Sequence, residues 1–143
     1  KWRGGTVPAL GWDDAMQTAP PPPSVLLLAH PTPASEDLFA DLARREDLCL
    51  LRVATAAAAN RTIDEMPVAL VVTCPEVPVA AVESVLSHLE RARPGTPVLA
   101  VRPRQPPEPA AWGTRGVAVL RLPLLAGVLS RSIDVVLGMK RLG

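Results

Sequence analysis

The sequence predicts an α/β fold in which a doubly wound, five-stranded parallel sheet carries helices on both faces. Five short, almost wholly apolar runs alternate along the chain with segments whose apolar side chains recur every three or four positions. Strands that are apolar on both sides indicate a parallel sheet between two helical layers, and right-handed crossovers make that sheet doubly wound. The 143 residues, 48% of them apolar and 20% charged, suffice to bury such a core.

Strands and helices alternate from residue 24 onward. The predicted strands cover residues 25–29, 48–53, 68–72, 97–101 and 116–122. The predicted helices cover residues 33–45, 55–66, 78–92 and 124–142. Thr32 and Pro33 mark the start of the first helix, because a threonine hydroxyl caps a first turn and proline fits its first position.

Proline and glycine set the later boundaries. Pro67 ends the second helix, and Pro94 with Gly95 ends the third, since proline cannot continue a helix. Residues 102–114 contain four prolines, so only a short helix fits before the last strand. The fourth helix is therefore predicted to be degenerate.

Residues 1–23 differ from the rest of the chain. They are rich in glycine and end in four consecutive prolines, which favour extended polyproline II geometry. We interpret this segment as a linker or as the end of a preceding element, with Trp2 and Trp12 packing on the domain surface or on a partner. The domain itself spans residues 24–143. Because the chain opens with Lys1 rather than methionine, we expect it to be a piece of a longer protein.

The composition argues against several classes of function. The net charge is +1, from 15 basic and 14 acidic residues, and only 3% of residues are aromatic, so we expect no direct contact with nucleic acid. Charged residues interrupt the apolar stretch 117–139, and residues 1–20 lack the core of a signal peptide, so no membrane contact is expected. Cys49 and Cys74 have no zinc spacing and are expected to be buried, reduced thiols of a cytoplasmic protein.

Four segments are similar to parts of the receiver domain of two-component response regulators. They are residues 25–30, 66–72, 93–101 and 116–124, which resemble the family's first strand, its approach to the third strand, its entry into the fourth strand and its fifth strand. The resemblance covers residues 24–143 and rests on the pattern of elements. It implies the flavodoxin-like sheet order 2-1-3-4-5.

The residues that carry chemistry in that family are replaced here. The acidic pair that follows the first strand and holds magnesium corresponds to Ala29 and His30. The aspartate that accepts the phosphoryl group corresponds to Thr73. A threonine or serine after the fourth strand corresponds to Arg102, and a lysine after the fifth strand corresponds to Leu122.

Together, these replacements remove the groups that phosphoryl transfer requires. The reaction needs a nucleophilic carboxylate, a hard cation on oxygen ligands and positive groups for the transferred charge. The resemblance therefore implies a pseudo-receiver with no enzymatic activity, no metal and no cofactor. We expect a signalling module that regulates an attached output domain or a partner protein through contacts that do not depend on phosphorylation. Its parent protein would be a transcription regulator or a sensor kinase.

An alternative function uses the altered edge of the sheet as a ligand site. His30, Cys74, Arg102 and Arg104 are predicted to converge on one rim, where an arginine would bind a nucleotide or another small anion. A histidine or cysteine there would sense pH or redox state. The competing interpretation is a decayed site filled by ordinary side chains.

The predicted last helix has a wider apolar stripe than one sheet face needs. The excess predicts a homodimer or an interdomain contact through Leu125, Val128, Leu129 and Val136. Two further features stay open at this point. Arg102, Arg104, Arg115 and Arg121 form either an anion-binding cluster or a solvated rim. Trp112 is either an exposed anchor for a partner or a buried plug.

Overall fold

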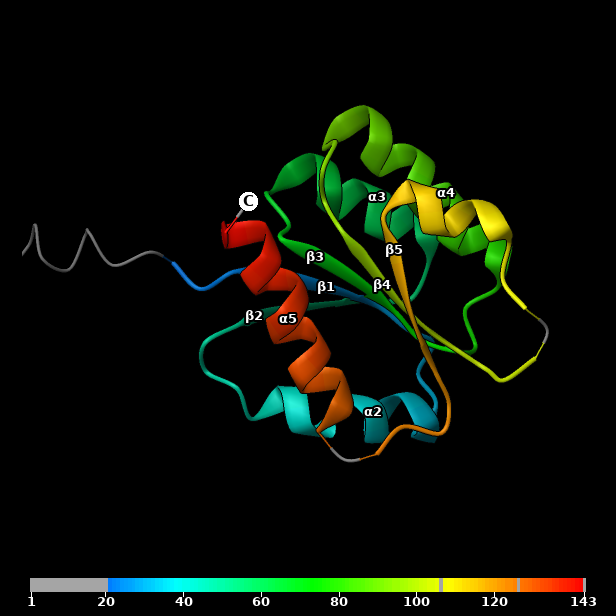
Figure 1. Cartoon of the computed structure of the whole chain (residues 1–143). Helices are drawn as coiled ribbons and strands as arrows, with labels where there is room; N and C mark the ends of the chain where they lie inside the picture. Colours follow the sequence, from blue (N-terminus) through cyan, green and yellow to red (C-terminus); the bar gives the residue numbers. More distant parts are fainter. Residues whose placement is uncertain (1–20, 106, 126, 143) are drawn as a thin grey trace, which may run out of the picture.

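The computed structural model describes residues 21–105, 107–125 and 127–142 and contains five strands and five helices in this part of the chain (Figure 1). The strands are β1 (Ser24–Leu28), β2 (Cys49–Val53), β3 (Leu70–Thr73), β4 (Val98–Arg102) and β5 (Val117–Arg121). The helices are α2 (Pro33–Ala43), α3 (Ala56–Glu65), α4 (Val79–Ala92), the 3-10 helix η1 (Ala110–Arg115) and α5 (Val128–Leu142). Most of the predicted linker, with Trp2 and Trp12, lies outside the described residues.

The five strands form one parallel sheet in the order β2-β1-β3-β4-β5, which confirms the predicted fold class and strand order. The three inner strands supply much of the core, because β3 and β4 are buried at every position and β1 at all but its first. All carboxyl ends of the strands lie at one edge of the sheet. The loops that follow β1, β3, β4 and β5 therefore meet there.

Two helical layers cover the sheet. Helices α2 and α5 lie on one face, and α3 and α4 lie side by side on the other, with η1 on the same side as α4 (Figure 1). The core between sheet and helices is apolar and includes Phe39, Ile63, Leu86 and Ile133. Within the described residues, no helix combines the length and the apolar composition that a membrane crossing requires.

A local signal explains the start of α2. Thr32 caps α2, since its side chain accepts a hydrogen bond from the Ser35 backbone N–H at 3.2 Å, as the threonine–proline pair predicts. Helix α2 ends at Ala43 rather than at Arg45.

The last helix also begins later than predicted, at Val128 rather than at Leu124. Gly127 immediately before it has a φ of 84°, a left-handed conformation that is not helical. Leu124 and Leu125 therefore belong to the preceding connection. The predicted degenerate fourth helix is confirmed as the six-residue η1, which lies after the proline-rich stretch.

Candidate functional site

The residues that follow β1 and end β3 lie next to each other at the carboxyl edge of the sheet. Leu28 is the register partner of both Val53 and Thr73. Ala29 continues this pairing, because its backbone N–H donates to the Val53 carbonyl at 3.0 Å. Ala29 and Thr73 are therefore neighbours, as the strand pattern predicts.

Thr73 ends β3 with its side chain fully buried. Its Oγ1 has no hydrogen-bond partner within the described part of the chain, so no base contacts it there. A hydroxyl becomes a nucleophile only when a neighbouring group accepts its proton. Among the described residues, the Thr73 hydroxyl has no such neighbour.

Leu122 stands after β5, where the receiver family has a lysine. Its backbone N–H donates to the Arg102 carbonyl at 3.0 Å, which extends the pairing of β4 with β5 beyond the last residue of β5. Its side chain packs against the hydrophobic core. This position consequently supplies hydrocarbon and no positive charge to the edge.

Cys74 is completely buried, and its backbone N–H donates to the Leu28 carbonyl at 3.0 Å. Burial raises the pKa of the Cys74 thiol to about 12, although a hydrogen bond with Ser35 opposes the rise. A neutral thiol without solvent contact is a poor redox sensor. Its burial fits the predicted buried thiol and does not favour the alternative, a redox-sensing role for Cys74. Cys49 on β2 is also a free thiol, but it is only half-buried.

Glu76 brings a carboxylate to this edge that sequence reasoning missed. Its Oε1 accepts hydrogen bonds from the Ser35 hydroxyl and, at 3.4 Å, from the Thr32 hydroxyl at the start of α2. The position of Glu76 shortly after β3 was the available signal. In the described ranges, no three histidine, cysteine, aspartate or glutamate side chains gather into a metal-binding group.

Arg102 turns inward from the end of β4 and is only 4% exposed. Its Nη1 donates to the Val77 carbonyl at 2.9 Å, and its guanidinium carbon lies 5.8 Å from the centre of the buried Trp112 ring. Arg102 is therefore covered in this conformation, because both faces of β4 are covered and its last side chain enters the core. Of the other predicted rim residues, His30 is half-buried and Arg104 is exposed.

The predicted arginine cluster is divided among separate contacts. Arg115 forms two hydrogen bonds of 2.9 Å with the Glu90 carboxylate of α4. Arg121 pairs with Glu108, a residue of the proline-rich loop between β4 and η1. These contacts fasten η1 and the loop to neighbouring elements. The cluster is thus neither a continuous cationic patch nor a wholly solvated rim.

The predicted apolar contact face is also divided. Leu125 is 80% exposed, whereas Leu129 is 5% exposed and belongs to the core. Val128 and Val136 are half-buried. The structure therefore removes Leu129 from the predicted contact face and leaves Leu125 as its most accessible member.

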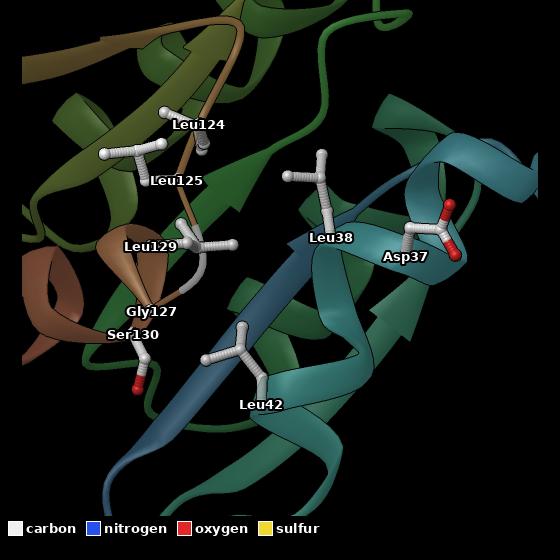
Figure 2. Close-up of a pocket in the computed structure, with 8 residues that line it drawn as sticks. All are labelled: Asp37, Leu38, Leu42, Leu124, Leu125, Gly127, Leu129 and Ser130. Carbon is white, nitrogen blue, oxygen red and sulfur yellow. The ribbon is translucent and has the colours of Figure 1, made fainter.

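A pocket of about 180 Å³ lies beside Leu125, between α2 and the start of α5. Figure 2 shows the leucines that line it, which come from α2, from the connection after β5 and from the first turn of α5. They are Leu38, Leu42, Leu124, Leu125 and Leu129. The Asp37 carboxylate points away from these leucines (Figure 2), but Asp37, Gly127 and Ser130 also line the pocket, so its surface is mixed rather than wholly apolar.

Arg45 holds the two helices beside this pocket in position. It follows α2, and its guanidinium bonds with Asp134 of α5 at 2.7 Å and with the Ser130 hydroxyl at 3.0 Å. It also pairs with Asp47 at 2.6 Å. The side chain of Arg45 is only 17% exposed, so this network is partly shielded from water.

Solved structures with the same architecture include receiver domains. The signal receiver domain of a putative LuxO repressor protein from Vibrio parahaemolyticus superposes with a TM-score of 0.70 and 20% identity, covering 84% of this chain and 93% of that chain. The receiver domain of a response regulator from Saccharomyces cerevisiae, crystallised with a histidine phosphotransfer signalling protein, gives a TM-score of 0.63 and 13% identity, covering 83% of this chain and 92% of that chain. The chain has the receiver-domain fold.

The same fold also occurs as part of an enzyme. A lysine decarboxylase from Francisella novicida matches with a TM-score of 0.65 and 12% identity, covering 82% of this chain but only 17% of that chain. No model of a known protein family matches the sequence, and none of the curated proteins matches it either. This fold therefore does not specify one function, which depends on the residues at the edge of the sheet and on the surface.

Proposed function

We propose that this chain is a signalling module of the two-component type that acts through contacts with other proteins and without phosphorylation at Thr73. The fold supports this proposal, since several structures that share it are receiver domains. One of them was crystallised with a histidine phosphotransfer protein, which is a precedent for protein contacts on this fold.

The state of Thr73 is the observation that carries the proposal. Its hydroxyl is buried and without a partner in the described residues, and the neighbouring Ala29 offers no oxygen ligand. Phosphoryl transfer to a side chain relies on a positioned nucleophile and on cations that neutralise the transferred charge. Within the described residues, Thr73 has no hydrogen-bond partner that would position its hydroxyl, and Ala29 has no carboxylate that would hold a metal cation.

Intact-mass spectrometry after incubation with acetyl phosphate and magnesium tests this part of the proposal. We expect no gain of a phosphoryl group, whereas a receiver domain that retains its aspartate, treated in parallel, gains one. A stable phosphoryl adduct on this chain, mapped to any residue at the carboxyl edge, would contradict the proposal.

The contact surface that we propose is Leu125 with the leucine-lined pocket beside it. A leucine side chain that is 80% exposed beside a recess with five leucines in its lining provides apolar area for a hydrophobic contact. Contiguous apolar area of this kind on a protein surface often marks a contact with a partner. A second copy or a domain attached to α5 is the partner that the last helix suggests.

Sedimentation equilibrium on the wild type and two matched variants tests this surface. Leu125→Asp is expected to weaken self-association about tenfold or more, because it places a charge in the apolar contact. Val135→Asp is the control, since Val135 is 60% exposed on α5 and does not line the pocket. Equal effects of the two substitutions, or a wild type that stays monomeric at millimolar concentration, would argue against a self-association role.

A further inference from the structure

Two arginines stand opposite each other where β4 and β5 end. Arg102 and Arg121 are register partners, so their side chains leave the same face of the sheet. Like charges at neighbouring register positions repel each other unless an anion lies close to both. This face of the sheet is the one that η1 covers, because Arg102 lies against Trp112 there.

The chain itself supplies a carboxylate to one of these two arginines. The Glu108 carboxylate pairs with Arg121 through Oε1, and Arg121 also donates to the Pro103 carbonyl at 3.2 Å. The pKa of Glu108 is lowered mainly by the hydrogen bond from Arg121 and, to a smaller degree, by the charge of Arg102. Glu108 forms its ion pair with Arg121 alone, so the two arginines and this carboxylate together carry a net charge of +1.

The hydrogen-bonding capacity of the three residues is incompletely used. Arg102 is more than nine-tenths buried, yet its Nε has no partner among the described residues. Glu108 Oε2 and the Trp112 indole nitrogen are likewise buried without a partner in that part of the chain. Two buried N–H donors without an acceptor, together with the net positive charge, suit an additional oxyanion that is larger than a carboxylate.

We propose that Arg102 and Arg121 form a binding site for an oxyanion of the phosphate class, which the Glu108 carboxylate occupies in the described conformation. A phosphate group would displace Glu108, accept hydrogen bonds from both guanidinium groups and neutralise the remaining charge. This site differs from the position of Thr73, and it requires no covalent step. It goes beyond the proposed contact function, which does not depend on it.

Isothermal titration of inorganic phosphate into the full chain, in chloride buffer at low ionic strength, tests the site. Glu108→Ala removes the internal competitor and is expected to bind phosphate about tenfold or more tightly than the wild type. Phosphate should also raise the melting temperature of Glu108→Ala more than that of the wild type. Adding Arg121→Met to this variant should abolish both gains.

Glu90→Ala is the matched control, because Glu90 likewise forms an ion pair with one arginine, Arg115, and the charge of Arg91 also lowers its pKa, but neither of these arginines is buried. The proposal is overturned if Glu108→Ala binds phosphate no better than the wild type, if Glu90→Ala gains equally, or if Arg121→Met leaves the gain intact. Should Glu108→Ala fail to fold, the wild type still gives a result. Phosphate should shift the indole N–H resonance of Trp112, assigned with Trp112→Phe, and an unshifted resonance overturns the proposal.

Discussion

The guanidinium carbon of Arg102 lies 5.8 Å from the centre of the Trp112 ring, and both residues are almost completely buried. A cation above an indole face is attracted by the ring, more strongly when both groups are removed from water. Trp112 lies in the short helix η1, which six residues of 3-10 geometry could hardly stabilise alone. The pair therefore fixes η1 to the end of β4.

Replacing Trp112 tests this anchoring role. Trp112→Ala is expected to lower the free energy of unfolding by about 3–5 kcal/mol, because it empties a large buried site and removes the ring from Arg102. Trp112→Phe retains a ring and should cost clearly less. Urea unfolding followed by circular dichroism measures both variants. Equal losses would show that the ring face is not the stabilising feature.

Thr73→Val is expected to leave stability unchanged or to increase it by about 1 kcal/mol. The substitution replaces a buried hydroxyl that has no partner in the described residues with a methyl group of similar shape. Chemical denaturation of the variant checks the sign. A loss of more than about 1 kcal/mol would reveal a hydrogen bond that this conformation does not contain.

Cys74 should resist alkylation in the folded protein. A pKa of about 12, against a usual value of 9.0, means about a thousandfold less thiolate at pH 8, and burial also blocks the reagent. Mass spectrometry after iodoacetamide treatment should therefore find Cys49 modified before Cys74. Denaturant should remove the difference between the two cysteines, and equal rates without denaturant would contradict the prediction.

The same thiol predicts a loss of stability at high pH. Its pKa is raised in the folded state, so the unfolded chain releases the proton first, and the free energy of unfolding falls as pH rises from about 9 toward 12. The slope approaches about 1.4 kcal/mol per pH unit. Cys74→Ala should flatten this part of the pH profile, and an unchanged slope would assign it to other groups.

Arg45→Met should loosen α5 from α2 at a cost of about 1–2 kcal/mol, because Arg45 is mostly shielded and bonds with both Asp134 and Ser130. Arg52→Met is the control. Arg52 pairs with Glu36 on the surface, where water screens the pair, and its loss should cost less than about 1 kcal/mol. Urea unfolding measures both, and hydrogen exchange in α5 should quicken only in Arg45→Met.

The sequence was sufficient to predict the sheet and its order because each strand combines an apolar run with a proline, glycine or capping residue at its border. Thr32 and Pro33 illustrate this, since their local chemistry alone places the start of α2. The start of α5 was predicted too early because Leu124 and Leu125 continue the apolar spacing, whereas Gly127 interrupts the helical backbone.

The candidate site was less predictable because tertiary contacts decide where its side chains lie. A strand that is apolar on both faces has no alternation that would tell which way Arg102 turns at its end. The pairing of Glu108 with Arg121 depends on the path of a proline-rich loop, for which no periodic pattern exists. Glu76 was missed because its partner Ser35 is distant in sequence, so no local pattern indicates the contact.

Two successive residues of one short loop hold opposite sides of the molecule together. Glu76 binds the hydroxyls at the beginning of α2, and the carbonyl of Val77 accepts the hydrogen bond of Arg102, whose guanidinium rests on Trp112. Through these hydrogen bonds, the loop after β3 connects the α2 side of the sheet with the η1 side. A partner that displaces the first turn of α2 would therefore disturb a series of side-chain contacts that begins at Glu76. The series ends at the buried Trp112 on the other side of the sheet.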